Sequence, residues 1–459
     1  MVVPLLIKHN KVDPQQITVV DKRPSTRARF DSPIAAGINY VQDELTRENM
    51  DVFLSKYLKE GDFLLDLAWN IDANEIIGWA HDHGVIYLNT SIEEWDPYAL
   101  GHTRPVQDRT LYYRHMKLRA LTDQWNGKGP TAIVEHGANP GLVSHLTKRA
   151  LNEIGTKALN DGLAANGVEK ALESENYPAL AHALGVKVIH IAELDTQVSD
   201  QPKRLNEFVN TWSVEGFYEE GIAPAELGWG THEKQLPHRG FEHKSGPRNQ
   251  IAIAQPGATT WVRSWVPHRP TNGMVIRHGE AFTIADHLTV WDGEKAVYRP
   301  TVHYAYCPTD AAIASMRELE ALQWNITDNQ RIMNDEIIDG EDRLGVLLMG
   351  HPYTSWWTGS LLNIHDARKL IPGQSATTVQ VGSAVYAAVV WAMDNPDRGY
   401  MVPDDMPWRE VLDIAEPYWN VTSVQSDWTP ISDRNDLFKG WNGREYDESD
   451  PWQFKNFLV

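Results

Sequence analysis

The sequence predicts an α/β protein with a parallel-sheet domain at its amino end and a second, α+β domain after it. Over roughly the first third, short apolar strands alternate with helical stretches, which favours a parallel sheet covered by helices on both faces. From about residue 142 the strands instead alternate apolar and polar residues, which is typical of antiparallel pairing. At 459 residues the chain is also too long for one ordinary core.

The first domain is expected to span residues 1–141. Its expected elements are a helix at 1–9, strands at 17–21, 62–69, 85–91 and 130–141, and helices at 72–84 and 110–125. Asp72 and Glu75 have the spacing of a capping box, and Gly84 supplies a helix stop.

The second domain is expected to span 142–375, followed by a carboxyl-terminal part, 376–459, that packs back on the first domain. The expected elements are a helix from 142, strands at 186–197, 259–267, 273–279 and 281–290, a hairpin at 291–293 and an apolar helix at 380–394. The turn-rich remainder of the tail is expected to wrap irregularly around the protein.

Charge and cysteine content restrict the partners of the protein. A formal charge of -20 argues against nucleic acid and against an anionic membrane surface as partners. A single cysteine, Cys307, excludes an intrachain disulfide and a thiolate-only zinc site, so we expect a cytoplasmic protein. No metal site is predicted, because H-E-x-x-H, C-x-x-C and Walker motifs are absent.

One strand-ending acid, Asp21, has two interpretations. In a Rossmann-like unit, the acid after the second strand binds the ribose hydroxyls of NAD. The phosphate-binding turn G-x-G-x-x-G lies about 20 residues before that acid, yet no glycine precedes Asp21 in this sequence. Asp21 is therefore either a cofactor residue or an ordinary aspartate at a strand end.

Residues 135–145, EHGANPGLVSH, place Asn139 where a strand meets a helix. Ligands of open α/β sheets bind at the carboxyl ends of strands. The alternative is an ordinary strand–turn–helix joint with Pro140 at the helix start.

Acids and aromatic residues are concentrated between residues 190 and 230, and Glu193, Glu220 and Trp212 belong to this group. Carboxylates beside an aromatic face suit a buried alkylammonium, because they supply charge, hydrogen-bond acceptors and a cation–π contact. The alternative is that the acids are exposed and the tryptophans belong to the core.

In residues 275–286, His278, Glu280 and Asp286 are expected on and just after a strand. A histidine beside an acid is able to move a proton near neutral pH, although the pattern alone is weak.

These segments, GANPGLVS, HIAELDTQ and FVNTWSVEGF, together with AELGWGT, ITVVD, HYAY, GVLLMGH and SDPWQF, resemble bacterial homospermidine synthases in the same order along the whole chain. The resemblance implies a Rossmann domain and a substrate and dimerisation domain related to saccharopine dehydrogenases. It also implies a homodimer in which NAD acts as a prosthetic group. Two putrescines, or putrescine and spermidine, would yield homospermidine by oxidation, loss of ammonia, imine formation and reduction.

The resemblance further implies roles for individual residues. Trp212 would stabilise cationic intermediates, Glu193 and Glu220 would anchor ammonium groups or exchange protons, and His278 would be the acid–base group. The substrate-binding residues would be Glu93, Asn70, Asn139 and Glu280. The cofactor-binding residues would be Asp21, Leu67, Ala68, Thr90 and Asn139.

Two departures from the family pattern stand out. Asn70 takes the place of an acid after the strand at 62–69, and Leu67 and Ala68 replace smaller or polar residues. The family's first strand and glycine-rich loop would precede residue 1, so we expect the chain as given to retain NAD weakly.

Two alternatives remain open. One is a carboxynorspermidine- or saccharopine-type imine reductase, which requires a carboxylate-binding arginine such as Arg277. The other is a catalytically silent polyamine-binding protein.

Overall fold

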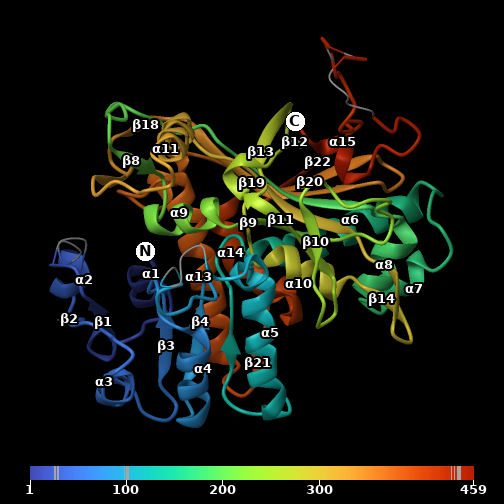
Figure 1. Cartoon of the computed structure of the whole chain (residues 1–459). Helices are drawn as coiled ribbons and strands as arrows, with labels where there is room; N and C mark the ends of the chain where they lie inside the picture. Colours follow the sequence, from blue (N-terminus) through green and yellow to red (C-terminus); the bar gives the residue numbers. More distant parts are fainter. Residues whose placement is uncertain are drawn as a thin grey trace.

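A computed structural model describes residues 1–459 except 25–26, 28–29, 98, 100–102, 436, 439 and 442–445. Figure 1 shows the amino-terminal elements gathered on one side of the molecule and a large mixed sheet on the other. The first helix of the second domain, α6, lies against that sheet, and the long helix α13 lies close to the amino-terminal elements.

The amino-terminal part contains two parallel sheets. Its elements are α1 (Val2–His9), β1 (Thr18–Asp21), α2 (Asp31–Ala35), β2 (Asn39–Gln42), α3 (Met50–Tyr57), β3 (Phe63–Asp66), α4 (Ala73–Asp82), β4 (Ile86–Asn89), α5 (Leu111–Thr122) and β5 (Ala132–Ile133). β1 pairs with β2, and β3, β4 and β5 form a second sheet together with β21 (Tyr400–Met401), which comes from the carboxyl-terminal region.

The parallel pairing predicted from the sequence is confirmed in both sheets. The strands are shorter than expected: β3 ends at Asp66, and only two residues of 130–141 form a strand. The predicted cap of α4 is present, because the Asp72 carboxylate accepts hydrogen bonds from the amides of Asn74 and Glu75 at 3.0 and 3.1 Å.

The second part is built around a ten-stranded mixed sheet. Its helices are α6 (Leu142–Asn160), α7 (Val168–Glu173), α8 (Tyr177–Leu184), α9 (Val214–Ile222), α10 (Glu280–His287), α11 (Asp310–Ala321) and α12 (Ile364–Leu370). The sheet contains β6 (Val188–Asp195), β9 (Pro224–Gly228), β10 (Gly240–Glu242), β11 (Gln250–Pro256), β12 (Trp261–Val266), β13 (Arg269–Met274), β16 (Thr301–Cys307), β19 (Glu341–Met349), β20 (Ser355–Asn363) and β22 (Thr422–Ser426).

Short strand pairs and carboxyl-terminal helices complete the fold. The pairs are β7 (Val198–Ser199) with β18 (Ile337–Asp339), β8 (Phe208–Asn210) with β17 (Gln330–Ile332), and β14 (Val290–Asp292) with β15 (Lys295–Tyr298). The last helices are α13 (Ala376–Asp394), α14 (Trp408–Trp419) and α15 (Phe454–Phe457). The hairpin predicted at 291–293 is confirmed as β14–β15. Part of the tail expected to wrap the protein lies outside the described residues.

Two sequence expectations were wrong. Residues 273–279 were expected to form a strand, but only Gly273 and Met274 belong to one, at the end of β13. Residues 281–290 were expected to form a strand, but α10 occupies Glu280–His287. Ala281, Ile284, Ala285 and Leu288 are all buried and have helical spacing, so one face of a helix buries the same apolar residues. His278 therefore lies in the turn before a helix, and Glu280 and Asp286 lie on that helix.

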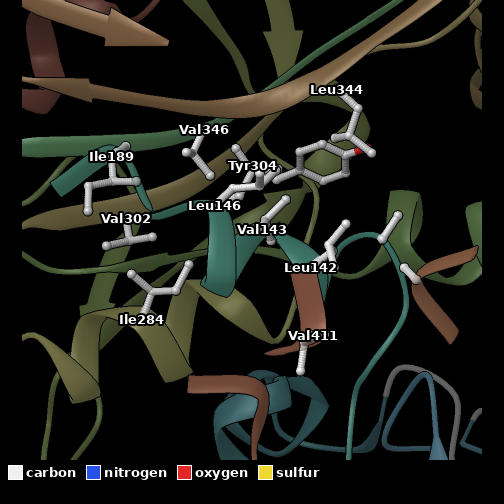
Figure 2. Close-up of a cluster of buried hydrophobic side chains, with 14 of the residues drawn as sticks. Leu142, Val143, Leu146, Ile189, Ile284, Val302, Tyr304, Leu344, Val346 and Val411 are labelled. Atoms are coloured by element: carbon white, nitrogen blue, oxygen red, sulfur yellow. The ribbon is translucent and has the colours of Figure 1, made fainter. Parts of the chain in front are cut away.

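The main core lies between α6 and one face of the large sheet. Figure 2 shows Leu142, Val143 and Leu146 of α6 beside Ile189, Val346 and the other apolar residues of this core cluster. Burial of such side chains is the dominant favourable term in folding. By length and composition α13 is able to cross a membrane, but 72% of its apolar window is buried, as in a core helix.

Candidate active site

Three polar side chains on neighbouring strands project from the same face of the large sheet. β16 runs parallel to β6, with Tyr306 opposite Glu193 and Tyr304 opposite Ile191. Because side chains alternate along a strand, Glu193, Tyr304 and Tyr306 share this face. The Tyr304 hydroxyl donates a hydrogen bond to Glu193 Oε2. Burial raises the pKa of Glu193 to about 8, against the lowering effect of that hydrogen bond.

His278 lies between the buried carboxyl group of Glu280 and the partly buried carboxyl group of Glu220. Its Nε2 is 3.0 Å from Glu220 Oε2, and its Nδ1 is 3.3 Å from Glu280 Oε1. Burial lowers the pKa of His278, but the charges of Glu220 and Glu280 outweigh burial and raise the pKa well above its ordinary value. The centroid of the His278 ring also lies 4.4 Å from that of Tyr304. Because Tyr304 is hydrogen-bonded to Glu193, the side chains of His278, Tyr304 and Glu193 form one group.

Trp212 forms one wall of this group. Its Nε1 donates a hydrogen bond to the Tyr306 hydroxyl at 3.0 Å. The indole lies close to the backbone of α9, since a Cβ at Gly216 would be 2.9 Å from Trp212 Cζ3. Ser213 caps α9 by accepting a hydrogen bond from the Gly216 amide at 3.0 Å. The cap thus holds α9, with Glu220 one turn further along, against the indole.

Asn139 reaches the same group from the turn between β5 and α6. Its Nδ2 is 3.5 Å from His278 Nδ1. The turn around it requires glycine, because a Cβ at Gly141, where φ is +129°, would be 2.1 Å from the Gly137 carbonyl oxygen. Thr90 lies beside this turn, with its Cγ2 3.7 Å from the Cβ position of Gly137. Thr90 and the turn that carries Asn139 therefore lie side by side after β4 and β5.

Asp21 ends β1 as predicted. Its carboxylate accepts a hydrogen bond from the Arg23 amide at 2.7 Å, and the Arg23 guanidinium pairs with Glu215 of α9 at 3.2 Å. After β3, Leu67 is 56% exposed, and the buried Asn70 Oδ1 has no hydrogen-bond partner among the described residues. An acid at the end of β1, and an exposed apolar side chain and an unpaired acceptor after β3, are of the kinds that fit the ribose and ring of a dinucleotide. Ala68 lies in the same exposed loop, and its amide donates to Asp66.

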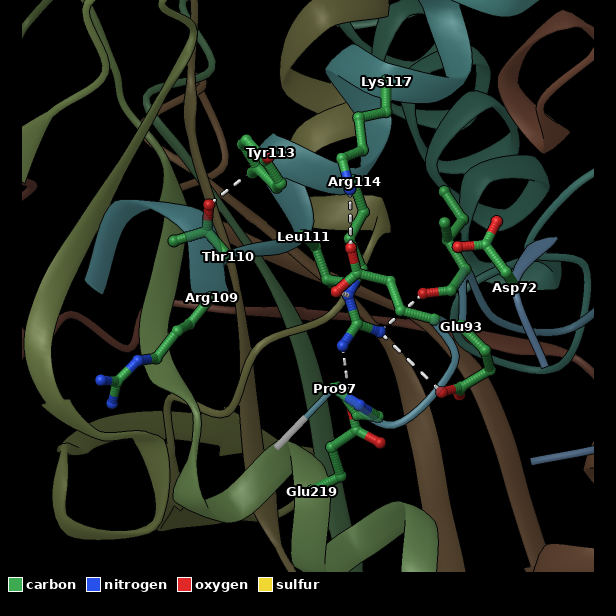
Figure 3. Close-up of polar contacts among 12 residues, drawn as sticks. Asp72, Glu93, Pro97, Arg109, Thr110, Leu111, Tyr113, Arg114, Lys117 and Glu219 are labelled. Atoms are coloured by element: carbon green, nitrogen blue, oxygen red, sulfur yellow. Dashed lines mark hydrogen bonds and ion pairs between the residues drawn. The ribbon is translucent and has the colours of Figure 1, made fainter. Parts of the chain in front are cut away.

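Glu93 belongs to a second buried group, centred on Arg114 of α5 (Figure 3). Arg114 Nη2 is 2.8 Å from Glu219 Oε1, and Arg114 Nη1 is 3.8 Å from Glu93 Oε2. Burial and the charge of Glu219 raise the pKa of Glu93 to about 7. This group joins α5 to α9, and no ion pair links Glu93 to His278 in the part of the chain that the structure describes.

Sequence reasoning missed several residues of these groups. They are Tyr304, Tyr306, Arg114, Glu135 and His115. The Glu135 carboxylate lies 3.0 Å from His115 Nε2, and a Cβ at Gly279 would be 1.9 Å from Glu135 Oε2. The alternation in HYAY, residues 303–306, was an available signal, because it places two tyrosines on one face of a buried strand. No sequence signal pairs Arg114 with Glu219, which is 105 residues away.

The described residues contain no group of three or more His, Cys, Asp or Glu side chains arranged to hold a metal ion. The chemistry available here is that of carboxyl groups, one charged histidine and aromatic faces. Together these groups bind cations, move protons and hold the substrate beside a bound cofactor.

Known proteins match the whole chain. The saccharopine dehydrogenase NADP binding domain family matches residues 1–133, and the saccharopine dehydrogenase C-terminal domain family matches residues 137–421. A homospermidine synthase of Mesorhizobium japonicum is 40% identical over 99% of this chain and 93% of its own length. A homospermidine synthase of Blastochloris viridis is 40% identical over 99% of this chain and 94% of its own length.

A crystal structure agrees with these matches. The homospermidine synthase of Legionella pneumophila, solved in complex with NAD, has a TM-score of 0.88 and 36% identity over 100% of this chain and 95% of its own. The chain belongs to the homospermidine synthase family.

Proposed function

We propose that the protein is an NAD-dependent homospermidine synthase that joins two putrescines, or putrescine and spermidine, with release of ammonia. The observation that carries this proposal is the convergence of Glu193, Glu220 and Glu280 on a single cation, His278. Two buried carboxyl groups, Glu193 and Glu280, and one partly buried group, Glu220, surround a single cation and leave an excess of hydrogen-bond acceptors, which a diammonium substrate would satisfy.

Trp212 supplies the remaining recognition element. Its indole lies in the same group and is held by Tyr306, so the ring face is available to an alkylammonium or iminium as a cation–π partner. Glu193 and Glu220 anchor or deprotonate the substrate nitrogen, Asn139 and Glu280 orient His278, and His278 donates a proton to the departing nitrogen. Glu93, in the group centred on Arg114, holds the distal amine of the substrate.

The amino-terminal domain holds the cofactor in this proposal. When bound, NAD supplies hydride removal from the first carbon–nitrogen bond and hydride return to the final imine. Asp21 would bind the ribose, and Leu67, Ala68, Asn70, Thr90 and Asn139 would surround the rest of the nucleotide. Asp21→Ala should weaken NAD binding in calorimetry. Asp31→Ala, in the first turn of α2, should leave NAD binding unchanged.

Arg277 argues against a carboxylated substrate. Its Nη1 donates to the Arg109 carbonyl oxygen at 3.0 Å, and its Nη2 pairs with Glu219. These contacts engage the guanidinium with Glu219, in the group centred on Arg114. A carboxylate would meet Glu193, Glu220 and Glu280 instead, at a cost in charge repulsion.

The test is product analysis. Purified protein incubated with putrescine and NAD should form homospermidine and ammonia in equal amounts, measured by mass spectrometry and an ammonia assay. Glu193→Gln should lose turnover, while Glu320→Gln, on the exposed end of α11, should retain it. Formation of a carboxylated secondary amine from an amino acid would refute the proposal.

We also propose a cytoplasmic homodimer. A single cysteine and the family resemblance support it. Light scattering should then give twice the 52.0 kDa mass of one chain.

A further inference from the structure

Two further buried carboxyls continue from Glu193 along the same sheet face. Asp195 follows on β6, and Asp342 of β19 lies directly opposite Asp195 in the antiparallel register. Glu193, Asp195 and Asp342 are each at most 2% exposed. Among the described residues, none of the three forms an ion pair with lysine or arginine. Three adjacent carboxylates with no such partner are not stable in a low-dielectric interior, so protons must be shared among them.

The three carboxyl groups are neighbours on one sheet face. Asp342 is diagonal to Glu193 across β19 and β6, and burial together with the charge of Glu193 raises the pKa of Asp342 well above its ordinary value, which favours a proton on this pair. The Thr377 hydroxyl is 2.6 Å from Asp342 Oδ2 and 3.5 Å from Asp195 Oδ2. Asp342 Oδ1 has no hydrogen-bond donor among the described residues. The row Glu193–Asp342–Thr377–Asp195 is therefore continuous, with acceptor capacity left over.

The far end of the row meets a cavity. A cavity of about 710 Å³ beyond the carboxyl ends of β6 and β16 is lined by Asp195 and Gln197. Gln197 holds the Asp195 carboxylate from its amide at 2.9 Å and its side-chain Nε2 at 3.0 Å. Thr211 donates to the other oxygen of Asp195 at 2.8 Å. One end of the row thus contacts the site around His278, and the other end contacts this cavity.

The site needs such an outlet. His278 is already protonated, because Glu220 and Glu280 hold it in the charged form, so it is not a free base at neutral pH. Of the two proposed bases, Glu220 is paired with His278 at 3.0 Å, and burial keeps a proton on Glu193 near neutral pH. Glu193 accepts a proton from the substrate only if its own proton leaves, and Tyr304, Tyr306, Glu220 and His278 face it on the site side.

We propose that Glu193, Asp342, Thr377 and Asp195 form a proton relay from the active site to the cavity beyond the carboxyl ends of β6 and β16. This relay rests on the proposed function, because its proton comes from the ammonium group of the substrate. One oxygen of Glu193 takes a proton from the substrate ammonium while its other oxygen passes a proton to Asp342. Asp342 passes a proton to the Thr377 hydroxyl, which passes its own to Asp195, and Asp195 releases one to water in the cavity. One proton leaves the substrate nitrogen, one reaches solvent, and no electrons move.

Asp342 and Thr377 are positioning residues in this scheme, so their test must separate proton transfer from folding. Asp342→Asn and Thr377→Val should lower kcat about tenfold or more, raise the solvent deuterium isotope effect and move the pH profile of kcat, with little change in KM. Thr377→Ser, which retains the hydroxyl, should show the wild-type kcat, solvent deuterium isotope effect and pH profile. Asp404→Asn, at a buried carboxyl on the far side of α6, should leave them unchanged.

An infrared measurement tests the shared proton without turnover. At neutral pH the protein should show a protonated-carboxyl band that shifts in deuterium oxide and weakens in Asp342→Asn, while Asp404→Asn leaves that part of the band unchanged. Wild-type pH profile and isotope effect in both Asp342→Asn and Thr377→Val, or an unaltered band in Asp342→Asn, would overturn the relay. Failure of the wild-type protein to form homospermidine would instead count against the proposed function, and the infrared band would still decide whether the carboxyls share a proton.

Discussion

The indole N–H of Trp212 donates a hydrogen bond to the Tyr306 hydroxyl at 3.0 Å. This contact joins α9 to β16 and fixes the edge of the indole, which leaves the ring face as the surface offered to a substrate. The ring is further enclosed by Phe217, 5.9 Å away between centroids. An aromatic ring held this rigidly loses little entropy when it binds a cation.

Replacing Trp212 should affect turnover more than folding. A cation–π contact contributes about 0.5–2 kcal/mol, so Trp212→Ala should reduce kcat/KM about 2- to 30-fold or more. Trp212→Phe retains a ring that binds cations more weakly, so its kcat/KM should lie between that of the wild type and that of Trp212→Ala. Steady-state kinetics and urea unfolding measure both effects, and normal putrescine turnover by Trp212→Ala would rule out the cation–π role.

Removing the Tyr304 hydroxyl should shift the pH dependence of substrate binding. The hydrogen bond from Tyr304 lowers the pKa of Glu193, so Tyr304→Phe should raise that pKa above its value of about 8. Because ionised Glu193 binds the ammonium, the rise of kcat/KM with pH should move upward by about one pH unit. Tyr298→Phe, which removes a buried hydroxyl bonded to the Val186 carbonyl, should leave the profile in place.

Adding a methyl group at Gly279 should disturb the turn that carries His278. The new Cβ would lie 1.9 Å from Glu135 Oε2, so Glu135 or the turn must move. Gly279→Ala should cost about 1–3 kcal/mol in unfolding free energy and reduce activity. Gly78→Ala, whose Cβ would lie 3.7 Å from Leu121, should be neutral or stabilise α4 by about 1 kcal/mol. Equal stability of the two variants would contradict this prediction.

Arg114 should stabilise the contact between α5 and α9. Arg114→Met removes a buried cation from beside Glu219 and Glu94, and should cost about 3–5 kcal/mol. Lys157→Met breaks an exposed pair with Asp161 and should cost less than about 1 kcal/mol. Urea unfolding of both variants measures the difference, and similar costs would show that the Arg114 group is not a structural joint.

Buried neutral histidines should make the protein sensitive to acid. His351 accepts a hydrogen bond from the Tyr353 amide and donates one to the Leu348 carbonyl, and burial lowers its pKa to about 4. The unfolded chain therefore binds a proton that the folded chain does not between about pH 6.5 and pH 4. As the pH is lowered from about 6.5 to about 4, the unfolding free energy should therefore fall by about 1.4 kcal/mol per pH unit for this histidine. His351→Gln should flatten the slope, whereas the exposed His365→Gln should not.

Local sequence patterns predicted much of the fold because they act over a few residues. Asp72 caps α4, and the turn at Trp291–Gly293 joins β14 to β15, since each depends on neighbours in the chain. Residues 281–290 were misjudged because a short apolar stretch suits a strand or a helix equally. Only the packing of α10 on β9 and β16 decided between them.

The order of motifs along the chain determined the family, and with it the expectation that Trp212, Glu193 and His278 act together. Tertiary structure decided the rest of the site: Glu93 lies with Arg114, and Asp342 lies opposite Asp195 across two antiparallel strands. Those contacts join residues about 20 to 150 positions apart in the chain. Their charge states depend on burial and neighbouring charges, which are properties of the packed interior and not of local sequence.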